Sequence, residues 1–101
     1  MTENINDNII AGLNKVFDSR IRLGIMSVLS VNDSADFSTL KELMELTDGN
    51  LATHLKALEK EGYIESSKRF INNKPNTTYT ITRLGNDRFR EHIDALEKLL
   101  K

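Results

Sequence analysis

The sequence predicts a mainly helical α+β domain in which a β-hairpin precedes the last helix. Two observations predict this class. Apolar residues recur at helical spacing through most of the chain. Residues 63–82 are instead rich in β-branched and aromatic residues and contain the turn signal "NNKPN". The length of 101 residues suits one domain, so we expect residues 1–101 to form a single folded unit.

Two helices are expected in the N-terminal third of the chain. Residues 5–17 carry a narrow apolar stripe, which is typical of a short amphipathic helix. The members of this stripe are Ile5, Ile9, Leu13 and Val16. A second helix is expected from Arg20 to Val31, after a cap at Asp18-Ser19. Its apolar residues lie on more than one side, which predicts a helix buried within the domain.

Residues 39–61 predict two helices joined by a tight turn. Thr39 and Glu42 fit a capping box, in which the hydroxyl and the carboxylate each bind a free backbone N–H at the helix start. This first helix is short and is expected to end near Leu46. Its expected inward-facing residues are Leu40, Leu43 and Met44.

The second helix of this pair is expected over residues 48–61. Thr47 or Asp48 caps its start, and Gly62 follows its last turn, where a left-handed residue is expected. The hairpin of residues 63–82 comes directly after it. Two helices joined by a short turn and followed by a two-stranded ribbon form a helix-turn-helix with a wing.

The outward face of residues 48–61 is polar at its start and basic further on. Its apolar residues Leu51, Leu55 and Leu58 must face the core. The opposite side starts small and polar and becomes basic, and Asn, Thr and Lys side chains can bond to base edges in the major groove. The predicted contacts here are Asn50, Thr53, His54, Lys56 and Lys60. The alternative is a merely solvated face, and His54 fits a packed boundary residue as well as a phosphate contact.

Basic and amide side chains also gather at the expected hairpin tip. These residues are Lys68, Arg69, Asn73 and Lys74. The one carboxylate of the hairpin, Glu65, lies at its base. A ribbon with such a tip can reach the DNA backbone or the minor groove. Hairpin tips are commonly polar, so the conjunction of tip and helix is what favours DNA binding.

The last helix is expected over residues 83–100, with Thr82 as a plausible cap. A chain of this length can cover one amphipathic stripe, but stripes on both end helices are harder to bury, which favours a homodimer. The alternative is that the two end helices pack on each other within one chain. The predicted dimer contacts are Ile5, Ile9, Leu13, Phe89, Ile93, Leu96 and Leu100.

Composition excludes several other classes. The formal net charge of -1 argues against a protein that coats nucleic acid by bulk charge. The chain has no cysteine, and its two histidines stand alone, so we expect no metal and no cofactor. No nucleophile–base pair or Gly-rich phosphate loop is visible, which argues against an enzyme. Neither a signal peptide nor a membrane-length apolar run is visible, so a cytoplasmic protein without membrane contact is expected.

Three stretches resemble the small winged-helix transcriptional regulators related to the MarR and ArsR groups. They are "SRIRLGIMSVL", "DFSTLKELMELTDGNLATHLKALEKEGYIE" and "KPNTTYTITRLGNDRF". The resemblance covers nearly the whole chain, from Leu13 to Leu99. It implies a homodimer on a pseudo-palindromic operator in double-stranded DNA. It places Asn50, Thr53, His54 and Lys56 on the recognition helix and residues 69–74 in the wing.

The chain departs from the ArsR-type metal sensors within this resemblance. It lacks a cysteine in the helix from Thr39 and paired histidines at its ends, so metal sensing is not expected. A small-molecule effector stays open, because no residue singles out a pocket. The function that the sequence favours is a sequence-specific DNA-binding regulator. The alternative is a winged-helix protein-interaction module, which would expose apolar anchors where this helix exposes Asn, Thr and Lys.

Overall fold

The computed structural model describes residues 10–100, which form a helical body with a β-ribbon. In chain order the elements are η1 (Lys15–Phe17), α2 (Arg20–Val31), β1 (Ala35–Asp36), α3 (Phe37–Met44), α4 (Asp48–Lys60), β2 (Ile64–Ile71), β3 (Lys74–Ile81) and α5 (Arg83–Leu99). The predicted α+β class, with a helix-turn-helix followed by a wing, is confirmed. The predicted boundaries of the last three helices and of the hairpin agree with the structure to within two residues.

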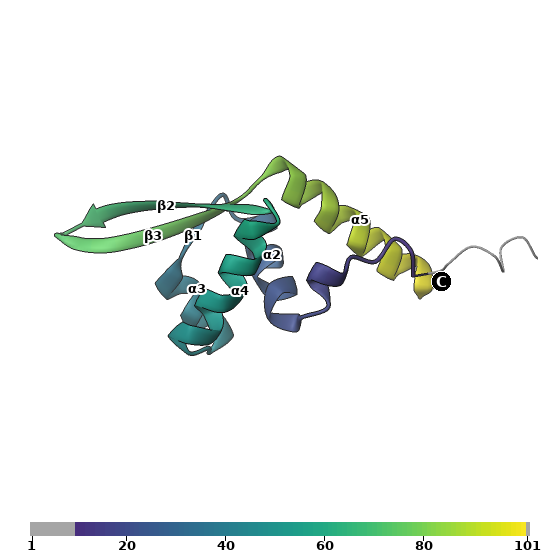
Figure 1. The fold of residues 1–101 in the computed structure, drawn as a ribbon, viewed down its shortest axis with the longest axis horizontal. Helices are drawn as coiled ribbons and strands as arrows, with labels where there is room; N and C mark the ends of the chain where they lie inside the picture. The colour runs from purple at the N-terminus through teal and green to yellow at the C-terminus, as the bar shows by residue number, and fades with distance from the viewer. Residues whose placement is uncertain (1–9, 101) are drawn as a thin grey trace, which may run out of the picture.

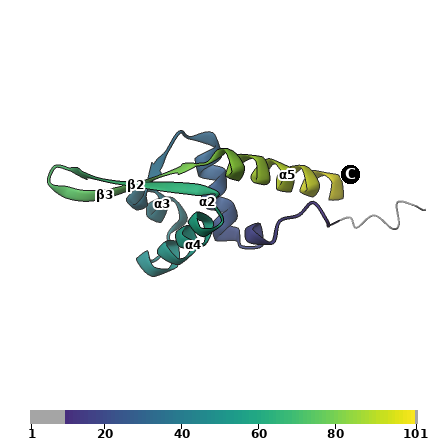
Figure 2. The same cartoon turned by 45° about the horizontal axis from the view of Figure 1, so that its top comes forward.

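The ribbon of β2 and β3 and the helix α5 leave the body in opposite directions (Figure 1). Helices α2, α3 and α4 pack together below the base of the ribbon, and α5 runs away from it beside the N-terminal segment (Figures 1 and 2). The antiparallel sheet has the order β1-β3-β2. Strand β1 pairs Ala35 with Tyr79 and Asp36 with Thr78. The sequence did not predict β1, because two residues show no periodicity.

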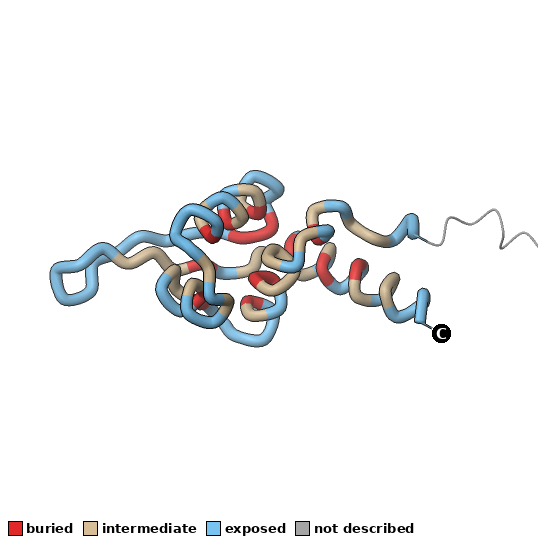
Figure 3. Tube along the Cα trace, turned by 90° about the horizontal axis from the view of Figure 1, so that it is seen from below, coloured by how far each residue is buried: buried red, intermediate tan, exposed pale blue. Residues whose placement is uncertain are grey.

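The core lies where α2, α3 and α4 meet the base of the sheet. Figure 3 shows the buried residues near the middle of the molecule, and exposed residues along the ribbon tip and at the end of α5. The largest fully buried side chains are Ile25, Met26, Leu29, Leu40, Leu51, Leu55 and Leu58. Six of these seven are aliphatic side chains from three helices, so apolar burial between helices holds the body together.

The predicted N-terminal helix over residues 5–17 is wrong for its described part. Residues 10–12 form a turn, and only Lys15–Phe17 are helical, as a 3-10 turn. Asn14 has an extended backbone, and its side-chain oxygen accepts a hydrogen bond from the Val16 N–H. A side chain that bonds the local backbone in this way competes with helix formation. Ile5 and Ile9 lie outside the described residues.

Two details of the predicted first helix of the pair are also wrong. The cap of α3 is Asp36, whose carboxylate accepts a hydrogen bond from the Thr39 N–H at 2.8 Å. Thr39 therefore lies inside the helix, because the pairing of β1 places Asp36 at the helix start. Leu43 is 61% exposed, so only Leu40 and Met44 of the predicted inward set face the core.

The junction between the wing and α5 depends on a close backbone approach. The Thr82 hydroxyl caps α5 by accepting from the Gly85 N–H at 2.9 Å, and it donates to the Gly62 carbonyl. A Cβ on Gly85 would clash with the Tyr63 carbonyl group. Gly62, with a φ of 79°, makes the turn between α4 and β2, as the sequence predicts. These contacts fix the direction in which α5 leaves the body.

Candidate nucleic-acid interface

Helix α4 presents the polar and basic face that the sequence predicts. Thr47 caps its start, and Leu51, Leu55 and Leu58 are buried. The residues on the opposite side that are exposed are Gly49, Asn50, Thr53, Lys56 and Lys60. The start of this face is open, because a Cβ on Gly49 would meet nothing within 4 Å. A DNA groove can therefore approach the first turns of α4 closely.

Two side chains on this face, Thr53 and Asn50, offer hydrogen-bonding groups to a base edge. Thr53 is exposed, and its hydroxyl donates to the Gly49 carbonyl at 2.9 Å, which leaves the oxygen lone pairs available as acceptors beside an apolar methyl group. These groups suit an exocyclic amine or a thymine methyl. The Asn50 side chain is exposed and carries both a donor and an acceptor, which suit adenine.

His54 is held against the body. One of its ring nitrogens, Nδ1, lies 3.0 Å from the guanidinium of Arg22, which also donates to the Val16 carbonyl. Burial, with the Arg22 charge in addition, lowers the pKa of His54 below its ordinary value. The sequence allowed two roles for His54, a packed boundary residue or a phosphate contact. A neutral ring that accepts a hydrogen bond from Arg22 favours the packed boundary residue.

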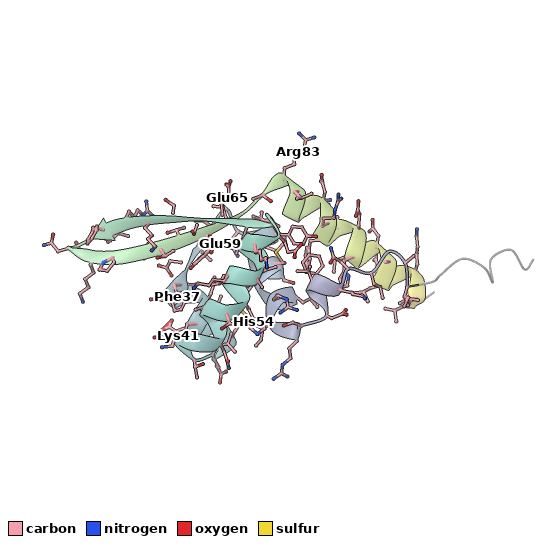
Figure 4. The ribbon with its side chains drawn as sticks, in the orientation of Figure 1. Phe37, Lys41, His54, Glu59, Glu65 and Arg83 are labelled. Carbon is pink, nitrogen blue, oxygen red and sulfur yellow. The ribbon has the colours of Figure 1, made fainter. Side chains whose placement is uncertain are left out.

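The carboxylate in the first turn of α4 is paired. Asp48 in the first turn of α4 forms an ion pair of 2.8 Å with Lys41 of α3. Lys41 and His54 are labelled in Figure 4 on the helices below the ribbon. Because Lys41 balances Asp48, the start of α4 does not present an uncompensated negative charge to a phosphate.

The wing is fastened to both helices of the pair. The Ser66 hydroxyl of β2 donates to the Glu59 carboxylate of α4 at 2.8 Å. Asp36, the cap of α3, accepts from the Asn76 amide of β3 at 3.1 Å. The Thr39 hydrogen bonds first, and then the Asn76 bond, lower the pKa of Asp36 below its ordinary value. The base of the ribbon is thus hydrogen-bonded both to α4 and to the cap of α3.

The strand register divides the predicted wing residues between the two faces of the ribbon. Paired residues share a face, and the face alternates along each strand. The pairs Ser66–Tyr79, Lys68–Thr77 and Phe70–Pro75 lie on one face, and the pairs Glu65–Thr80, Arg69–Asn76 and Ile71–Lys74 lie on the other. Figure 4 shows Glu59 on the α4 side of the ribbon and Glu65 on its opposite side. The single wing carboxylate is therefore on the face away from Lys68.

A hollow of about 380 Å³ lies between α4 and the face of the ribbon that carries Ser66 and Lys68. Lys56 of α4 and Lys68 of β2 both line it, as does Glu59. The Ser66 hydroxyl holds the Glu59 carboxylate in place, and Glu59 keeps its negative charge beside the two lysines. One predicted helix cation, Lys56, and one predicted wing cation, Lys68, thus line the same hollow.

The predicted tip residue Asn73 has a structural role of its own. Asn72 and Asn73 both have a positive φ, of 53° and 65°. Asn tolerates this left-handed backbone better than other non-glycine residues, and two such residues in succession close a tight hairpin. Lys74 pairs with Ile71 immediately after this turn.

The predicted dimer residues fall into three groups. Phe89 is buried within the chain, where its ring packs edge-on against Phe17 at 5.6 Å. Leu13, Ile93 and Leu96 are half-buried, and Ile93 packs against the core. Leu100 is 87% exposed. Of the predicted dimer residues within residues 10–100, Leu100 is thus the most exposed.

Sequence reasoning missed three residues that position this interface. Asp36 joins α3 to the wing, Arg22 holds His54, and His92 accepts a hydrogen bond from the Asn14 N–H at 3.0 Å through its Nδ1. No sequence signal identifies such pairs, because 40, 32 and 78 residues separate the partners. Within the described residues, no helix is both long and apolar enough to cross a membrane.

Comparison with known proteins gives a consistent result. Residues 21–100 match a family model described as "Winged helix DNA-binding domain". The chain is 38% identical over 87 residues to the uncharacterized protein MJ0432 of Methanocaldococcus jannaschii. The aligned region covers 86% of this chain and 95% of that protein.

Solved structures show the same fold. A transcriptional regulator homologue from Pyrococcus horikoshii OT3 is 31% identical with a TM-score of 0.73, over 85% of this chain and 90% of that one. A MarR-family transcriptional regulator from Silicibacter pomeroyi has a TM-score of 0.59 over 98% of this chain and 68% of that one. At 16% identity, this second likeness shows the fold alone.

Proposed function

The chain belongs to the winged helix DNA-binding domain family, and on that premise we propose that it is a transcriptional regulator that binds a specific site in double-stranded DNA. The observation that carries the proposal is the basic surface formed by the outward face of α4 and the adjoining face of the wing. Lys56 and Lys68 line one hollow there, and Glu59 beside them is bonded to Ser66.

The residues of this surface divide between reading and positioning. Asn50 and Thr53 lie in the first two turns of α4, where the open Gly49 lets base edges come within reach. Lys56, Lys60 and Lys68 bind phosphates there, because exposed ammonium groups act mainly on the charged backbone. Arg69 and Lys74, on the opposite face of the ribbon, bind phosphates from the wing tip. His54 positions α4 through Arg22, and Asn73 shapes the hairpin turn.

A homodimer on a pseudo-palindromic operator follows from the proposal. Two copies related by a two-fold axis would present two α4 helices to successive major grooves. The end of α5 and its C-cap, with the half-buried Leu96 and the exposed Leu99 and Leu100, supply the apolar surface for that contact. The site of a small-molecule effector is not part of the proposal.

Selection of bound fragments from random duplex DNA tests the proposal directly. The full chain should recover one sequence with two-fold symmetry and half-sites about one helical turn apart. Recovery of no enriched sequence would contradict it. A recovered site without symmetry would leave DNA reading in place and would remove the homodimer on a palindrome.

The second candidate is a protein-interaction module that uses the same fold. Leu43 on α3, which is 61% exposed, is the observation in its favour. A docking surface usually has a cluster of apolar anchors, whereas the face of α4 exposes Asn, Thr and Lys. Failure of the DNA selection would make this module the better account.

A further inference from the structure

The tip of the wing exposes apolar side chains, which have no role in contacts between cationic side chains and DNA phosphates. Phe70 is 75% exposed and Ile71 is 45% exposed, although both lie in the regular strand β2. Pro75, the partner of Phe70 across the ribbon, is exposed as well. Single apolar residues are common on surfaces, but a large aromatic ring at the end of a projecting ribbon gains little from its own chain.

The surroundings of Phe70 are positively charged. Between Ser66 and Thr82 the sequence has three cationic residues and no carboxylate. These three residues are Lys68, Arg69 and Lys74. The Asp36 carboxylate contacts β3 from outside the ribbon, but it does so at Asn76, and β1 pairs with β3 at Thr78 and Tyr79, toward the base of the ribbon. An apolar tip ringed by cations matches a polyanion with apolar interior surfaces better than it matches an ordinary protein surface.

The register places Phe70 on a defined side of the ribbon. It shares a face with Lys68, and Lys68 lines one hollow with Lys56 of α4. A duplex against the outward face of α4 therefore passes Lys68 and then meets Phe70, about 7 Å further along β2. The ribbon projects beyond the helices in Figure 1, and Phe70 is the residue before the last one of β2. Among residues 10–100 its side chain stays 75% exposed.

We infer that Phe70 is a wedge that enters the minor groove of the bound duplex and partly separates two stacked base pairs. The inference rests on the proposed function and adds to it a deformation of the DNA. Apolar side chains inserted from the minor groove unstack a base step and bend the duplex by roughly 20–90°. Lys68 and Arg69, on the two faces of the ribbon beside the ring, neutralise the phosphates on either side of the groove.

Such a wedge also contributes to sequence choice without contacting base edges. Pyrimidine–purine steps unstack most easily, so the recovered site should carry a flexible step where the wing reaches the duplex. The recognition helix and the wing would then select by different physical properties, namely base edges for α4 and deformability for the tip.

The test compares Phe70→Ala with Phe70→Leu and Val31→Ala on the duplex recovered by selection. Val31, at the end of α2, is 83% exposed and controls for loss of exposed apolar surface elsewhere. Donor and acceptor dyes at the duplex ends report the bend. A 2-aminopurine placed at successive steps reports unstacking through its fluorescence. Thermal unfolding of each variant checks the fold.

Wild type should bend the duplex by about 20° or more and should raise the 2-aminopurine signal at one step. Phe70→Ala should abolish both effects and should weaken binding roughly tenfold, in line with the loss of one aromatic stacking contact. Phe70→Leu should keep most of the bend, and Val31→Ala should behave as wild type.

An unchanged bend with Phe70→Ala would overturn the wedge and leave the proposed function intact. A change in the association state of the free protein, without a change in the bend, would also overturn it and would assign Phe70 to a contact between chains. If wild type binds no duplex at all, the proposed function fails and the wedge fails with it.

Discussion

The wing and α5 leave the body in opposite directions and expose different chemistry. Residues 66–82 carry three cations and no carboxylate, whereas Arg83–Leu99 carries four basic and four acidic residues. The wing is a charged arm, and α5 is a charge-balanced helix with exposed leucines at its end. The net charge of -1 is therefore unevenly distributed, with basic residues gathered on the wing. The distribution of charge indicates function here better than its total does.

The joint between these two regions should be the most sensitive position. Gly85→Ala puts a Cβ into the Tyr63 carbonyl group, which neither backbone can avoid without moving. We expect a loss of about 3 kcal/mol in the free energy of unfolding, at the upper end for overpacking. Gly49→Ala is the control, because its Cβ meets nothing within 4 Å. Urea unfolding measures both, and equal stability of the two variants would contradict the close approach.

The assembly surface should depend on the end of α5 and not on the wing. Leu96→Glu with Leu100→Glu places charges at the half-buried Leu96 and the exposed Leu100 and should cost about 2 kcal/mol or more of dimer affinity. The chain should then sediment as a monomer at micromolar concentration. Ile93 is a poorer probe, because it also packs against the core of its own chain. A wild-type chain that sediments as a monomer would remove the dimer.

The dependence of DNA binding on salt should come from the wing and α4 and not from α5. Lys68→Ala should reduce the slope of log affinity against log salt by roughly one unit, because one phosphate contact is lost. Lys98→Ala, in the last turn of α5, is the matched control and should leave the slope unchanged. Equal slopes for the two variants would show that the basic surface is not where DNA binds.

The contact between α5 and the N-terminal segment should have a small dependence on pH. Burial lowers the pKa of His92 below 6.5, although Asp18 opposes the shift. Its Nδ1 accepts from the Asn14 N–H, which a protonated ring cannot do. A lowered pKa means that this stability is complete above about 6.5 and declines as pH falls through the folded pKa.

His92→Gln removes this titration. Unfolding of the variant should therefore depend less on pH below about 6.5 than unfolding of wild type. His54 also has a lowered pKa and remains in both proteins, so the difference between the two curves reports His92 alone. Superimposable curves would contradict the assignment.

Elements with a periodic apolar pattern and a local cap were predictable from the sequence. Elements that depend on contacts between residues far apart in the sequence were not. Helices α2, α4 and α5 were predictable because their apolar spacing and their caps at Ser19, Thr47 and Thr82 are local signals. The prediction of a helix over residues 5–17 was wrong for the described residues, because an apolar stripe does not indicate that Asn14 adopts an extended backbone.

The candidate site shows the same division. The exposed face of α4 follows from helical periodicity, so Asn50, Thr53 and Lys56 could be placed outward from the sequence. Periodicity could not show that Asp36 fastens the wing or that Phe89 is buried within one chain. Nor could it place Lys68 and Arg69 on opposite faces, because that needs the strand register.

The most direct measurement compares binding of wild type, Asn50→Ala and Thr53→Ala to the selected duplex and to a scrambled duplex at several salt concentrations. If the outward face of α4 reads bases, each variant should lose on the order of 1–3 kcal/mol on the selected duplex. Binding to the scrambled duplex and the salt slope should stay close to those of wild type. Wild-type affinity of both variants for the selected duplex would contradict base reading by α4.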